Sequence, residues 1–399
     1  MKVCILTSSF PAYFGDTQSP FIYRFAKGLV DKKLDVEVVC PFYKRSKYNN
    51  EVFEGIKIRR FTYFFRRLQT FTEVGGIPEA IKSFYGKFQL PFFCFSFFLK
   101  SLQIGKKSDL IHAQWLLPSG FMGLILKKVY RKPLVVTTRG SEVLLASRSS
   151  FWKFIFKSVA MRCDCITSNN KKHLEIFKSF GINSDKLLYI PNGLDYALFK
   201  KRDKMKIRKK LRLNLNDKIV LFVGNLLNVK RCDILIKSFN YLADKNKKIK
   251  LLIVGDGALR YDLINLVKRL NLNSNITFIG SIDPASVYQY FNAADVFVLS
   301  SESEGRPNVV LEAMASGLPV VTTDVGDIRS FIKDGRDGFI VKINDINMLT
   351  NKLNKLLSSN ELRARFSLNG LKAVRKANPS WEEAALGYIK LYDSLLKNG

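Results

Sequence analysis

The sequence is poor in the residues that build metal sites and disulfide frameworks. Its 399 residues include two histidines, His112 and His173, and six cysteines, none of which forms a C-x-x-C pair. A zinc site made of histidine and cysteine ligands is therefore not expected. Most of the cysteines fall in apolar runs, which predicts free buried thiols and a reducing compartment.

Apolar runs long enough to cross a membrane are also missing. The N-terminal MKVCILTSSFP has an apolar run of four residues, too short for the core of a signal peptide. The most hydrophobic window, LPFFCFSFFL at 90–99, contains Pro91 and has about half the length of a spanning helix. We expect no transmembrane segment and no secretion, which predicts a cytoplasmic protein.

Acidic residues are scarce relative to basic ones. There are 65 Lys and Arg against 34 Asp and Glu, a formal net charge of +31. Both halves share the excess, since residues 1–198 hold 31 basic and 14 acidic residues and residues 199–399 hold 34 and 20. Such a chain favours polyanionic partners: nucleic acid, an anionic membrane or a phosphorylated small molecule. The alternative is a compositional bias that gives a solvated basic surface.

Short apolar runs alternate with amphipathic stretches along the whole chain, which predicts parallel sheets covered by helices. The pattern breaks at 200–212, where nine residues are basic. We therefore expect two α/β domains, at 1–198 and 199–378, followed by a terminal helix at 379–399. The expected strands are 2–9, 35–41, 109–115, 134–140, 165–169 and 187–193, then 218–225, 250–257, 276–281, 295–301, 319–323 and 338–342.

The segment SESEGRPNVVLEAMASG at 301–317 carries the clearest chemistry. A strand, a glycine-containing loop and the start of a helix follow one another there, an arrangement that binds anions through free backbone N–H groups and the helix dipole. Glu304 lies in the loop and Glu312 in the helix. Two carboxylates beside an anion site can accept hydrogen bonds from sugar hydroxyls. Either glutamate alone would more simply be a solvated acid.

This block, E-x7-E followed by AMASGLPVVTTDVGDIRSFIKDGRDGFIV, resembles the signature of glycosyltransferase family 4, the group 1 retaining transferases with the GT-B fold. Further segments resemble that family: SSFPAYFGDTQSPF at 8–21, LLYIPNGLDYALF at 187–199 and VGNLLNVKR at 223–231. The resemblance spans nearly the whole chain. It implies two Rossmann-like domains that face each other across a cleft, with the acceptor bound by the first and the nucleotide-sugar by the second. It also implies that the helix at 379–399 returns to pack on the first domain.

The resemblance also implies roles for single residues. Glu304 would contact the donor sugar, Glu312 the ribose, and Lys230 would neutralise the diphosphate as negative charge builds on the leaving group. Other donor-site residues would be those after Glu304, with backbone amides on the diphosphate, and two positions near the base: Gly305, Arg306, Pro307, Asn308 and Val309, then Gly257 and Ser281. Proline has no N–H, so Asn308 is the next donor after Arg306.

Several positions depart from the family pattern. Asn225 stands where the family has an arginine, so a positive charge on the diphosphate is missing unless Arg231 or Arg306 supplies it. Arg139 stands in place of a histidine, and we expect it to bind phosphate or sugar oxygens. Gly15 matches half of a Gly-Gly turn at the donor site. Asp16, next to it, and His112, at a strand end, are candidates for acceptor binding, or else a turn residue and a core-edge histidine.

The resemblance implies a same-face transfer from a UDP- or GDP-sugar without a metal or other cofactor, in which the leaving phosphate accepts the proton of the acceptor. Basic and aromatic residues interleave at 57–67, and 91–107 is aromatic and amphipathic. This favours an anionic membrane surface and a glycan or lipid-linked glycan acceptor of the cell envelope. No nucleic-acid-binding module is recognised. A non-catalytic nucleotide-sugar binder and a same-fold phosphorylase or epimerase remain alternatives.

Overall fold

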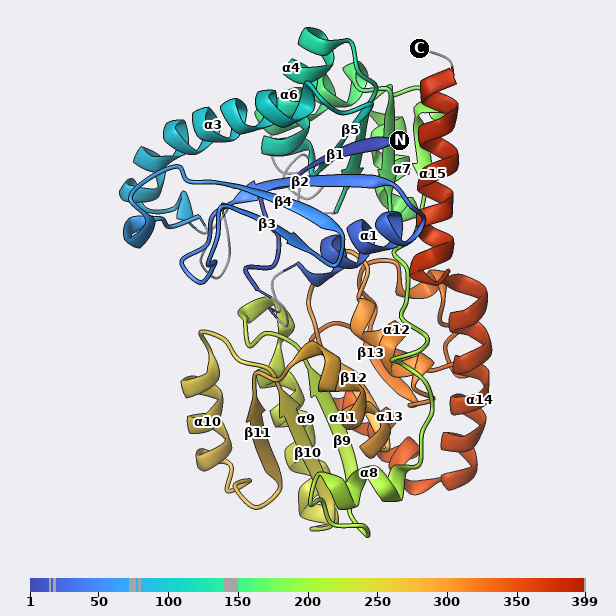
Figure 1. The fold of residues 1–399 in the computed structure, drawn as a ribbon. Coiled ribbons are helices and arrows are strands. Elements are labelled where there is room, and N and C mark those ends of the chain that lie inside the picture. The colour runs from blue at the N-terminus through green and yellow to red at the C-terminus, as the bar shows by residue number, and fades with distance from the viewer. Residues whose placement is uncertain (14–15, 17–18, 72–76, 78–79, 140–149, 398–399) are drawn as a thin grey trace. The chain divides into compact units, whose positions relative to one another are not determined.

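The computed structural model describes residues 1–13, 16, 19–71, 77, 80–139 and 150–397. The chain forms two compact α/β units (Figure 1). Unit 1 contains Met1–Gly193 and Pro379–Gly399, and unit 2 contains Leu194–Asn378. The first unit is thus built from both ends of the sequence, with the second unit inserted between them.

Unit 1 is built on an eight-stranded sheet with the order β3-β4-β2-β1-β5-β6-β7-β8. Its strands are β1 (Lys2–Leu6), β2 (Asp35–Pro41), β3 (Asn50–Phe53), β4 (Ile56–Phe61), β5 (Leu110–Gln114), β6 (Leu134–Thr138), β7 (Cys165–Ser168) and β8 (Leu187–Tyr189). All neighbours pair in parallel except β3 and β4, which form an antiparallel hairpin. Gly55 makes the turn of this hairpin with a φ of +84°.

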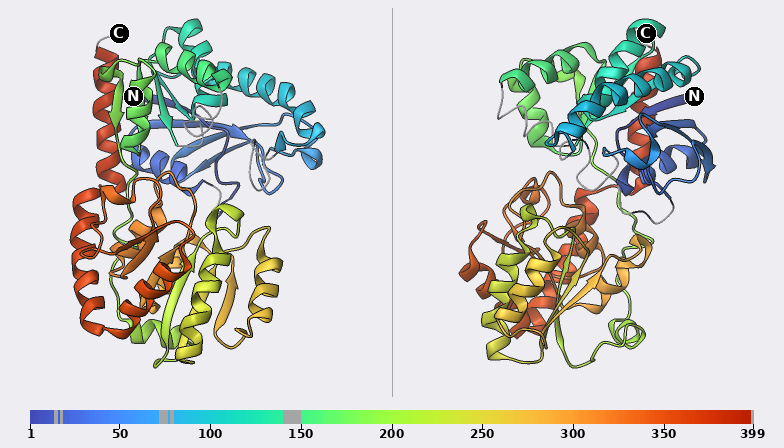
Figure 2. Two further views of the ribbon diagram at one scale, coloured as in Figure 1. Left: turned by 180° about the vertical axis from the view of Figure 1, so that it is seen from behind. Right: turned by 90° about the vertical axis from the view of Figure 1, so that its left-hand side faces the viewer.

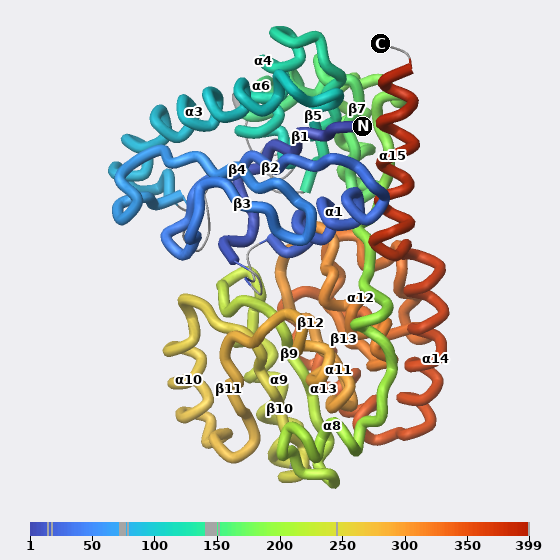
Figure 3. The backbone as a smooth tube through the Cα atoms, viewed as in Figure 1, coloured from blue at the N-terminus to red at the C-terminus, as the bar shows by residue number. Residues whose placement is uncertain are grey.

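Helices cover both faces of this sheet, as the view from behind in Figure 2 shows. They are α1 (Pro20–Asp31), α3 (Phe84–Gly105), α4 (Phe121–Tyr130), α6 (Ser150–Arg162), α7 (Lys171–Ser179) and α15 (Trp381–Lys397). Helices α3, α4, α6 and α7 pack on one face, and α1 and α15 pack on the other. Helix α15 lies beside α1 (Figure 3), where a Cβ at Gly28 would be 3.1 Å from the Trp381 carbonyl oxygen.

Unit 2 is built on a fully parallel six-stranded sheet with the order β11-β10-β9-β12-β13-β14. Its strands are β9 (Lys218–Val223), β10 (Ile249–Val254), β11 (Ile276–Gly280), β12 (Val296–Leu299), β13 (Val320–Thr323) and β14 (Phe339–Val341). Its helices are α8 (Lys204–Lys210), α9 (Cys232–Lys245), α10 (Arg260–Arg269), α11 (Val287–Ala293), α12 (Asn308–Ala315), α13 (Ile346–Ser358) and α14 (Asn360–Ala377).

Alternate side chains of each strand in unit 2 enter different cores. Val220 and Phe222 of β9 pack with α9, α10 and α13, whereas Ile219 and Leu221 pack with α11 and α12. A strand buried on both faces needs apolar residues throughout, because successive side chains point to opposite sides of the sheet. This explains why the central strands appear in the sequence as unbroken apolar runs.

The structure confirms the expected fold class and all twelve expected strands, with shifts of a few residues at their ends. It adds β3, which was not expected from the sequence, and β4, which overlaps the basic and aromatic stretch at 57–67. Among the described residues, no helix is both long and apolar enough to cross a membrane.

Candidate functional site

The expected donor residues of unit 2 lie on loops that follow the carboxyl ends of neighbouring parallel strands. Lys230 follows β9, Gly257 follows β10, Ser281 follows β11 and Glu304 follows β12. Because β9, β10 and β12 are adjacent in the sheet, their loops converge at one edge. Ligands of open parallel sheets bind at this edge.

A short hydrogen-bonded network joins the loops after β9 and β12. The Nζ of Lys230 lies 2.6 Å from Oε1 of Glu304, and the hydroxyl of Ser301 donates to the same oxygen at 2.7 Å. Both charged side chains are largely buried, with exposed fractions of 22% for Lys230 and 13% for Glu304. The Ser300 hydroxyl also donates to the Lys230 carbonyl oxygen at 2.9 Å, which ties the two loops together.

Glycines let these loops approach each other closely. A Cβ at Gly257 would lie 2.6 Å from the Leu226 carbonyl oxygen, so the loops after β9 and β10 touch backbone to backbone. Gly326, in the loop after β13, has a φ of +56°, and its Cβ would lie 2.4 Å from the Gly305 carbonyl oxygen. Any side chain at Gly326 would therefore displace the segment that holds Glu304.

Helix α12 begins directly after this segment. Its N-cap is Pro307, which makes no side-chain capping hydrogen bond. The first-turn amides of Asn308 and Val309 thus lie at a helix N-terminus, where the macrodipole favours negative charge. Glu312 is half-buried one turn further along. The local order of loop, helix N-terminus and acid agrees with the arrangement expected from the sequence.

Arg306 is a correction to the sequence analysis. Its guanidinium was a candidate for the missing cation on the diphosphate, but the side chain is fully buried. It forms an ion pair with Asp327, donates to the Asn378 side-chain oxygen at 2.5 Å, and lies over the Phe331 ring. Burial raises the pKa of Asp327, and the guanidinium opposes that shift. In this conformation Arg306 can meet a ligand through its backbone N–H only.

The other candidate for that cation, Arg231, is only partly buried. Its guanidinium contacts Asp233 at 3.1 Å, Glu302 at 3.5 Å and the Asn344 side-chain oxygen at 2.7 Å. Two carboxylates therefore already offset its charge. Asn225 and Ser281 are exposed, and no residue within the described part of the chain forms a hydrogen bond with either side chain.

In unit 1, Arg139 follows β6 and is held in place by two neighbours. Its Nε and Nη2 donate to the Gln114 side-chain oxygen at 3.1 and 2.6 Å, and its Nη1 donates to the Asn192 side-chain oxygen at 2.6 Å. The guanidinium also lies over the Phe21 ring, 4.8 Å from its centroid. This fixed cation at the carboxyl end of the sheet suits the binding role expected for it.

His112 is a second correction. It was a candidate for acceptor binding, but it is fully buried in the core of unit 1. Its Nδ1 hydrogen-bonds the Tyr392 hydroxyl and its Nε2 the Thr137 hydroxyl, both at 2.6 Å. Burial, with a contribution from Arg139, lowers the pKa of His112 to about 3. The residue is a neutral link between β5, β6 and α15, as the alternative of a core-edge histidine expected.

The N-terminal loop is described in part. Gly15 lies outside the described residues. The carboxylate of Asp16 accepts a hydrogen bond from the Ala12 N–H at 2.8 Å, which closes a local turn.

Four residues that the sequence analysis did not single out support the expected ones. They are Ser301 and Gly326 around Glu304, and Gln114 and Asn192 around Arg139. The sequence signal for these residues was their position: Ser301 and Gly326 each follow a strand closely, Gln114 is the last residue of β5, and Asn192 lies in the PNG turn. Their partners could not be read from the sequence, since each pair is distant along the chain.

Two such α/β units, each built on a largely parallel sheet covered by helices, have the architecture of the GT-B fold. Solved structures of this fold span the chain. Sucrose-phosphate synthase from Thermosynechococcus elongatus has a TM-score of 0.84 at 22% identity, covering 100% of both chains. Anabaena HepE in complex with UDP-glucose has a TM-score of 0.76 at 19% identity, covering 99% of this chain and 100% of the other.

Two family models match consecutive parts of the sequence. Glycosyltransferase Family 4 matches residues 18–198, and Glycosyl transferases group 1 matches residues 203–373. The chain belongs to this family of glycosyltransferases. It is 30% identical over 309 residues to an uncharacterized glycosyltransferase of Methanocaldococcus jannaschii, covering 75% of this chain and 81% of the relative. It is 27% identical over 385 residues to the capsular polysaccharide biosynthesis glycosyltransferase CapM of Staphylococcus aureus, covering 92% and 91%.

Proposed function

We propose that this glycosyltransferase moves a hexose from a UDP- or GDP-sugar to an envelope glycan or lipid-linked glycan, with retention of anomeric configuration. The observation that carries the proposal is the Lys230–Glu304 pair beside the start of α12. The relative CapM, named for capsular polysaccharide biosynthesis, supports the acceptor class, and HepE, solved with UDP-glucose, supports the donor class.

The pair suggests how the donor is received. Before the donor binds, the Lys230 ammonium neutralises the Glu304 carboxylate. A donor diphosphate at the N-terminus of α12 is a stronger anion and draws the ammonium to itself. Glu304 then keeps the hydrogen bond from Ser301 and accepts one from a sugar hydroxyl. Thus one exchange of partners prepares both the leaving group and the sugar.

Bond cleavage places negative charge on the departing nucleoside diphosphate. In our proposal Lys230 and the amides of Gly305, Arg306, Asn308 and Val309 stabilise this charge, which is the role that fixed donors play in electrostatic catalysis. The acceptor hydroxyl attacks from the same face and passes its proton to the leaving phosphate. No metal is assigned to the reaction, so activity should persist in excess EDTA.

A thermal-shift panel of UDP-, GDP-, ADP- and CMP-sugars identifies the donor. Binding at a hundredfold excess over Kd stabilises the native state by about 2.7 kcal/mol. The preferred donor should no longer stabilise the Glu304→Gln and Lys230→Met variants. A chain stabilised by none of these donors, or one that turns over a sugar with free phosphate and no nucleotide, would contradict the proposal. The anomeric configuration of the first-formed product, measured by NMR, tests retention separately.

We also propose that the protein contacts an anionic membrane through unit 1. Five phenylalanines form an exposed aromatic ridge, defined as Phe65, Phe84, Phe88, Phe92 and Phe95, with exposed fractions from 44% to 86%. Four of them line one face of α3, whose other face buries Phe93 and Phe97 in the core. The exposed cations Arg66, Arg67 and Lys87 flank the ridge. Aromatic side chains beside basic ones suit the interface of an anionic bilayer.

Co-sedimentation with vesicles tests this contact. The protein should bind phosphatidylglycerol-containing vesicles at low salt and bind pure phosphatidylcholine weakly. The triple variant F88S/F92S/F95S should lose most of this binding. The matched control is Y241S/Y261S/L368S, which removes three exposed apolar side chains from unit 2. Equal binding by the two variants would refute the role of the ridge.

A further inference from the structure

A basic pocket lies at the amino ends of the unit 1 strands, on the side of the sheet opposite to Arg139. Four of its lining residues each come directly before a strand: Asp109 before β5, Pro133 before β6, Asp164 before β7 and Lys186 before β8. The pocket is therefore at the amino ends of these strands, whereas Gln114 and Arg139 are at the carboxyl ends. It has a volume of about 1120 Å³, enough for a ligand of drug size.

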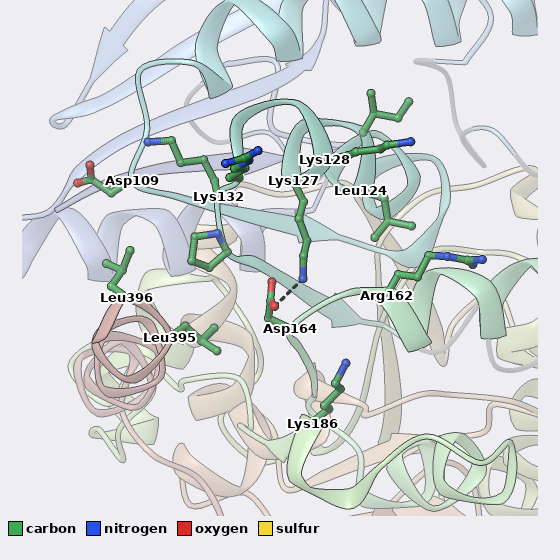
Figure 4. A pocket seen from close by; sticks show the side chains of 13 residues that line it. Asp109, Leu124, Lys127, Lys128, Lys132, Arg162, Asp164, Lys186, Leu395 and Leu396 are labelled. Atoms are coloured by element: carbon green, nitrogen blue, oxygen red, sulfur yellow. Dashed lines mark hydrogen bonds and ion pairs between the residues drawn. The ribbon is translucent and has the colours of Figure 1, made fainter. Parts of the chain in front are cut away.

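The pocket carries an excess of positive charge. Six cationic side chains line it against two carboxylates, and the cations are Lys127, Lys128, Arg131, Lys132, Arg162 and Lys186. Both carboxylates already have hydrogen-bonding partners within the protein. Asp164 pairs with Lys127 at 2.5 Å (Figure 4) and accepts from the Leu134 N–H at 2.8 Å. Asp109 accepts from the Lys2 N–H at 2.7 Å.

Two of the cations stabilise the end of α6. Lys186 donates to the carbonyl oxygens of Met161 and Cys163, both at 3.1 Å, and Arg162 donates to that of Ser158 at 3.0 Å. The attraction of cations to a helix C-terminus accounts for these contacts. The remaining three, Lys128, Arg131 and Lys132, form no hydrogen bond or ion pair with any residue that the structure describes.

Apolar side chains form another part of the wall. Leu124 and Ile125 come from α4, and Leu395 and Leu396 come from the last turns of α15. Leu396 has an exposed fraction of 36%. Figure 4 shows these leucines on two sides of the group formed by Lys127, Asp164 and Lys132. The pocket thus offers uncompensated positive charge next to an apolar surface.

We propose that this pocket binds an amphiphilic phosphate, in which a phosphate or diphosphate group is attached to a hydrocarbon chain. Lys128, Arg131 and Lys132 hold the anionic group, and the leucines of α4 and α15 hold the chain. Two sources have this chemistry: a free phosphorylated amphiphile and the headgroup region of an anionic bilayer. The pocket shares no residue with the donor residues of unit 2 or with the aromatic ridge, so its binding can be tested apart from the transfer reaction.

Calorimetric titration of the full chain at low salt tests the site, with a saturating amount of the nucleotide part of the preferred donor present to occupy the donor residues of unit 2. The probes are inorganic pyrophosphate and monomeric dihexanoyl phosphatidic acid. The variant K128Q/R131Q/K132Q should weaken binding of both probes at least tenfold. The control K206Q/K209Q/K210Q removes the same charge from exposed positions of α8 and should change binding less than twofold.

A second variant separates the two parts of the ligand. Leu396→Ser should weaken the binding of phosphatidic acid several-fold and leave the binding of pyrophosphate unchanged. Binding of the monomeric lipid identifies a free amphiphile as the ligand. Binding only to phosphatidic acid vesicles identifies a bilayer headgroup, provided that F88S/F92S/F95S keeps this binding and K128Q/R131Q/K132Q loses it. Equal losses in the pocket and control variants, or no binding of any probe by the unaltered chain, would overturn the proposal. Retained binding by Glu304→Gln shows that the pocket stands independently of the proposed transfer.

Discussion

Lys230 and Glu304 are 74 residues apart in the sequence, yet their charged atoms lie 2.6 Å apart and share Ser301 as a neighbour. Either side chain alone would be a poorly solvated charge. Together they are neutral. Under the proposed function a donor separates them, and the pair then links occupancy of the phosphate site to the availability of the carboxylate for the sugar.

Replacing Lys230 by Met should lower kcat/KM by about 10²–10³-fold, the loss typical when one donor to developing negative charge is removed. Glu304→Gln should also lower activity, and the double variant should lose less than the product of the two factors, because contacting residues are not additive. Initial rates of the unaltered enzyme, the two single variants and the double variant complete this double-mutant cycle. Lys237→Met, which removes a surface partner of Asp233, serves as the control. Activity of Lys230→Met within threefold of the unaltered enzyme would exclude the role.

Gly326→Ala should impair both folding and catalysis. The residue needs a positive φ, and a Cβ there would meet the Gly305 carbonyl oxygen at 2.4 Å. Gly335→Ala provides a matched comparison, since Gly335 has a φ of +75° but no atom within 4 Å of the added Cβ. We expect a loss of about 1–2 kcal/mol for Gly335→Ala from its conformation alone. Gly326→Ala should lower the free energy of unfolding, measured in urea, by more than Gly335→Ala does, and it should lower activity as well. Similar activities of the two variants would show that the contact is unimportant.

Arg139→Lys should lower kcat/KM by about tenfold or more and leave the unfolding midpoint nearly unchanged. Lysine keeps the charge but cannot contact Gln114 through two nitrogens and Asn192 through a third. Gln114→Leu should weaken activity in the same direction by releasing the guanidinium. Arg45→Lys, at an exposed position of the same unit, is the control. Full activity of Arg139→Lys would indicate that charge alone is needed.

Stability should fall as the pH drops below about 6.5. Burial lowers the pKa of His112 to about 3 and that of His173 to about 4. The unfolded chain, with histidine pKa values near ~6.5, binds protons that the folded chain does not. The stabilisation is therefore complete above that pH and is lost as the pH falls toward 4.

With both histidines titrating, the slope of the unfolding free energy approaches about 2.7 kcal/mol per pH unit. His112→Gln keeps a hydrogen-bonding side chain without a titrating group, so it should halve this slope. Urea unfolding at several pH values between 4 and 7 measures it. An unchanged slope would mean that His112 is protonated in the folded state.

The fold was predictable from the sequence because parallel strands buried on both faces appear as unbroken runs of apolar residues, as in KIVLFV of β9. The β3–β4 hairpin was missed because its strands sit at the sheet edge, where β3 alternates between exposed and half-buried residues. Arg59 and Arg60 of β4 looked like surface cations, but they pair with Glu37 and Glu51.

The positions of Lys230 and Glu304 on loops after strands, and of Glu312 in the helix that follows, were predictable from the order of elements along the chain. The state of each side chain was not. Arg306 and Glu304 are two residues apart in one loop, yet one faces the core and the other the ligand edge. That difference depends on Asp327 and Asn378, which come from distant segments. His112 likewise became a core residue through Tyr392, which is 280 positions away.

The placement of α15 has a consequence for synthesis on the ribosome. Tyr388 and Tyr392 complete the core of unit 1 against Phe25 and His112, but they follow all of unit 2 in the chain. Unit 2 can therefore fold as soon as it leaves the ribosome. Most of unit 1 is made earlier, but its apolar face stays exposed until α15 has been synthesised. The order of folding is reversed relative to the order of translation, and the nascent chain should engage chaperones longest through its first half.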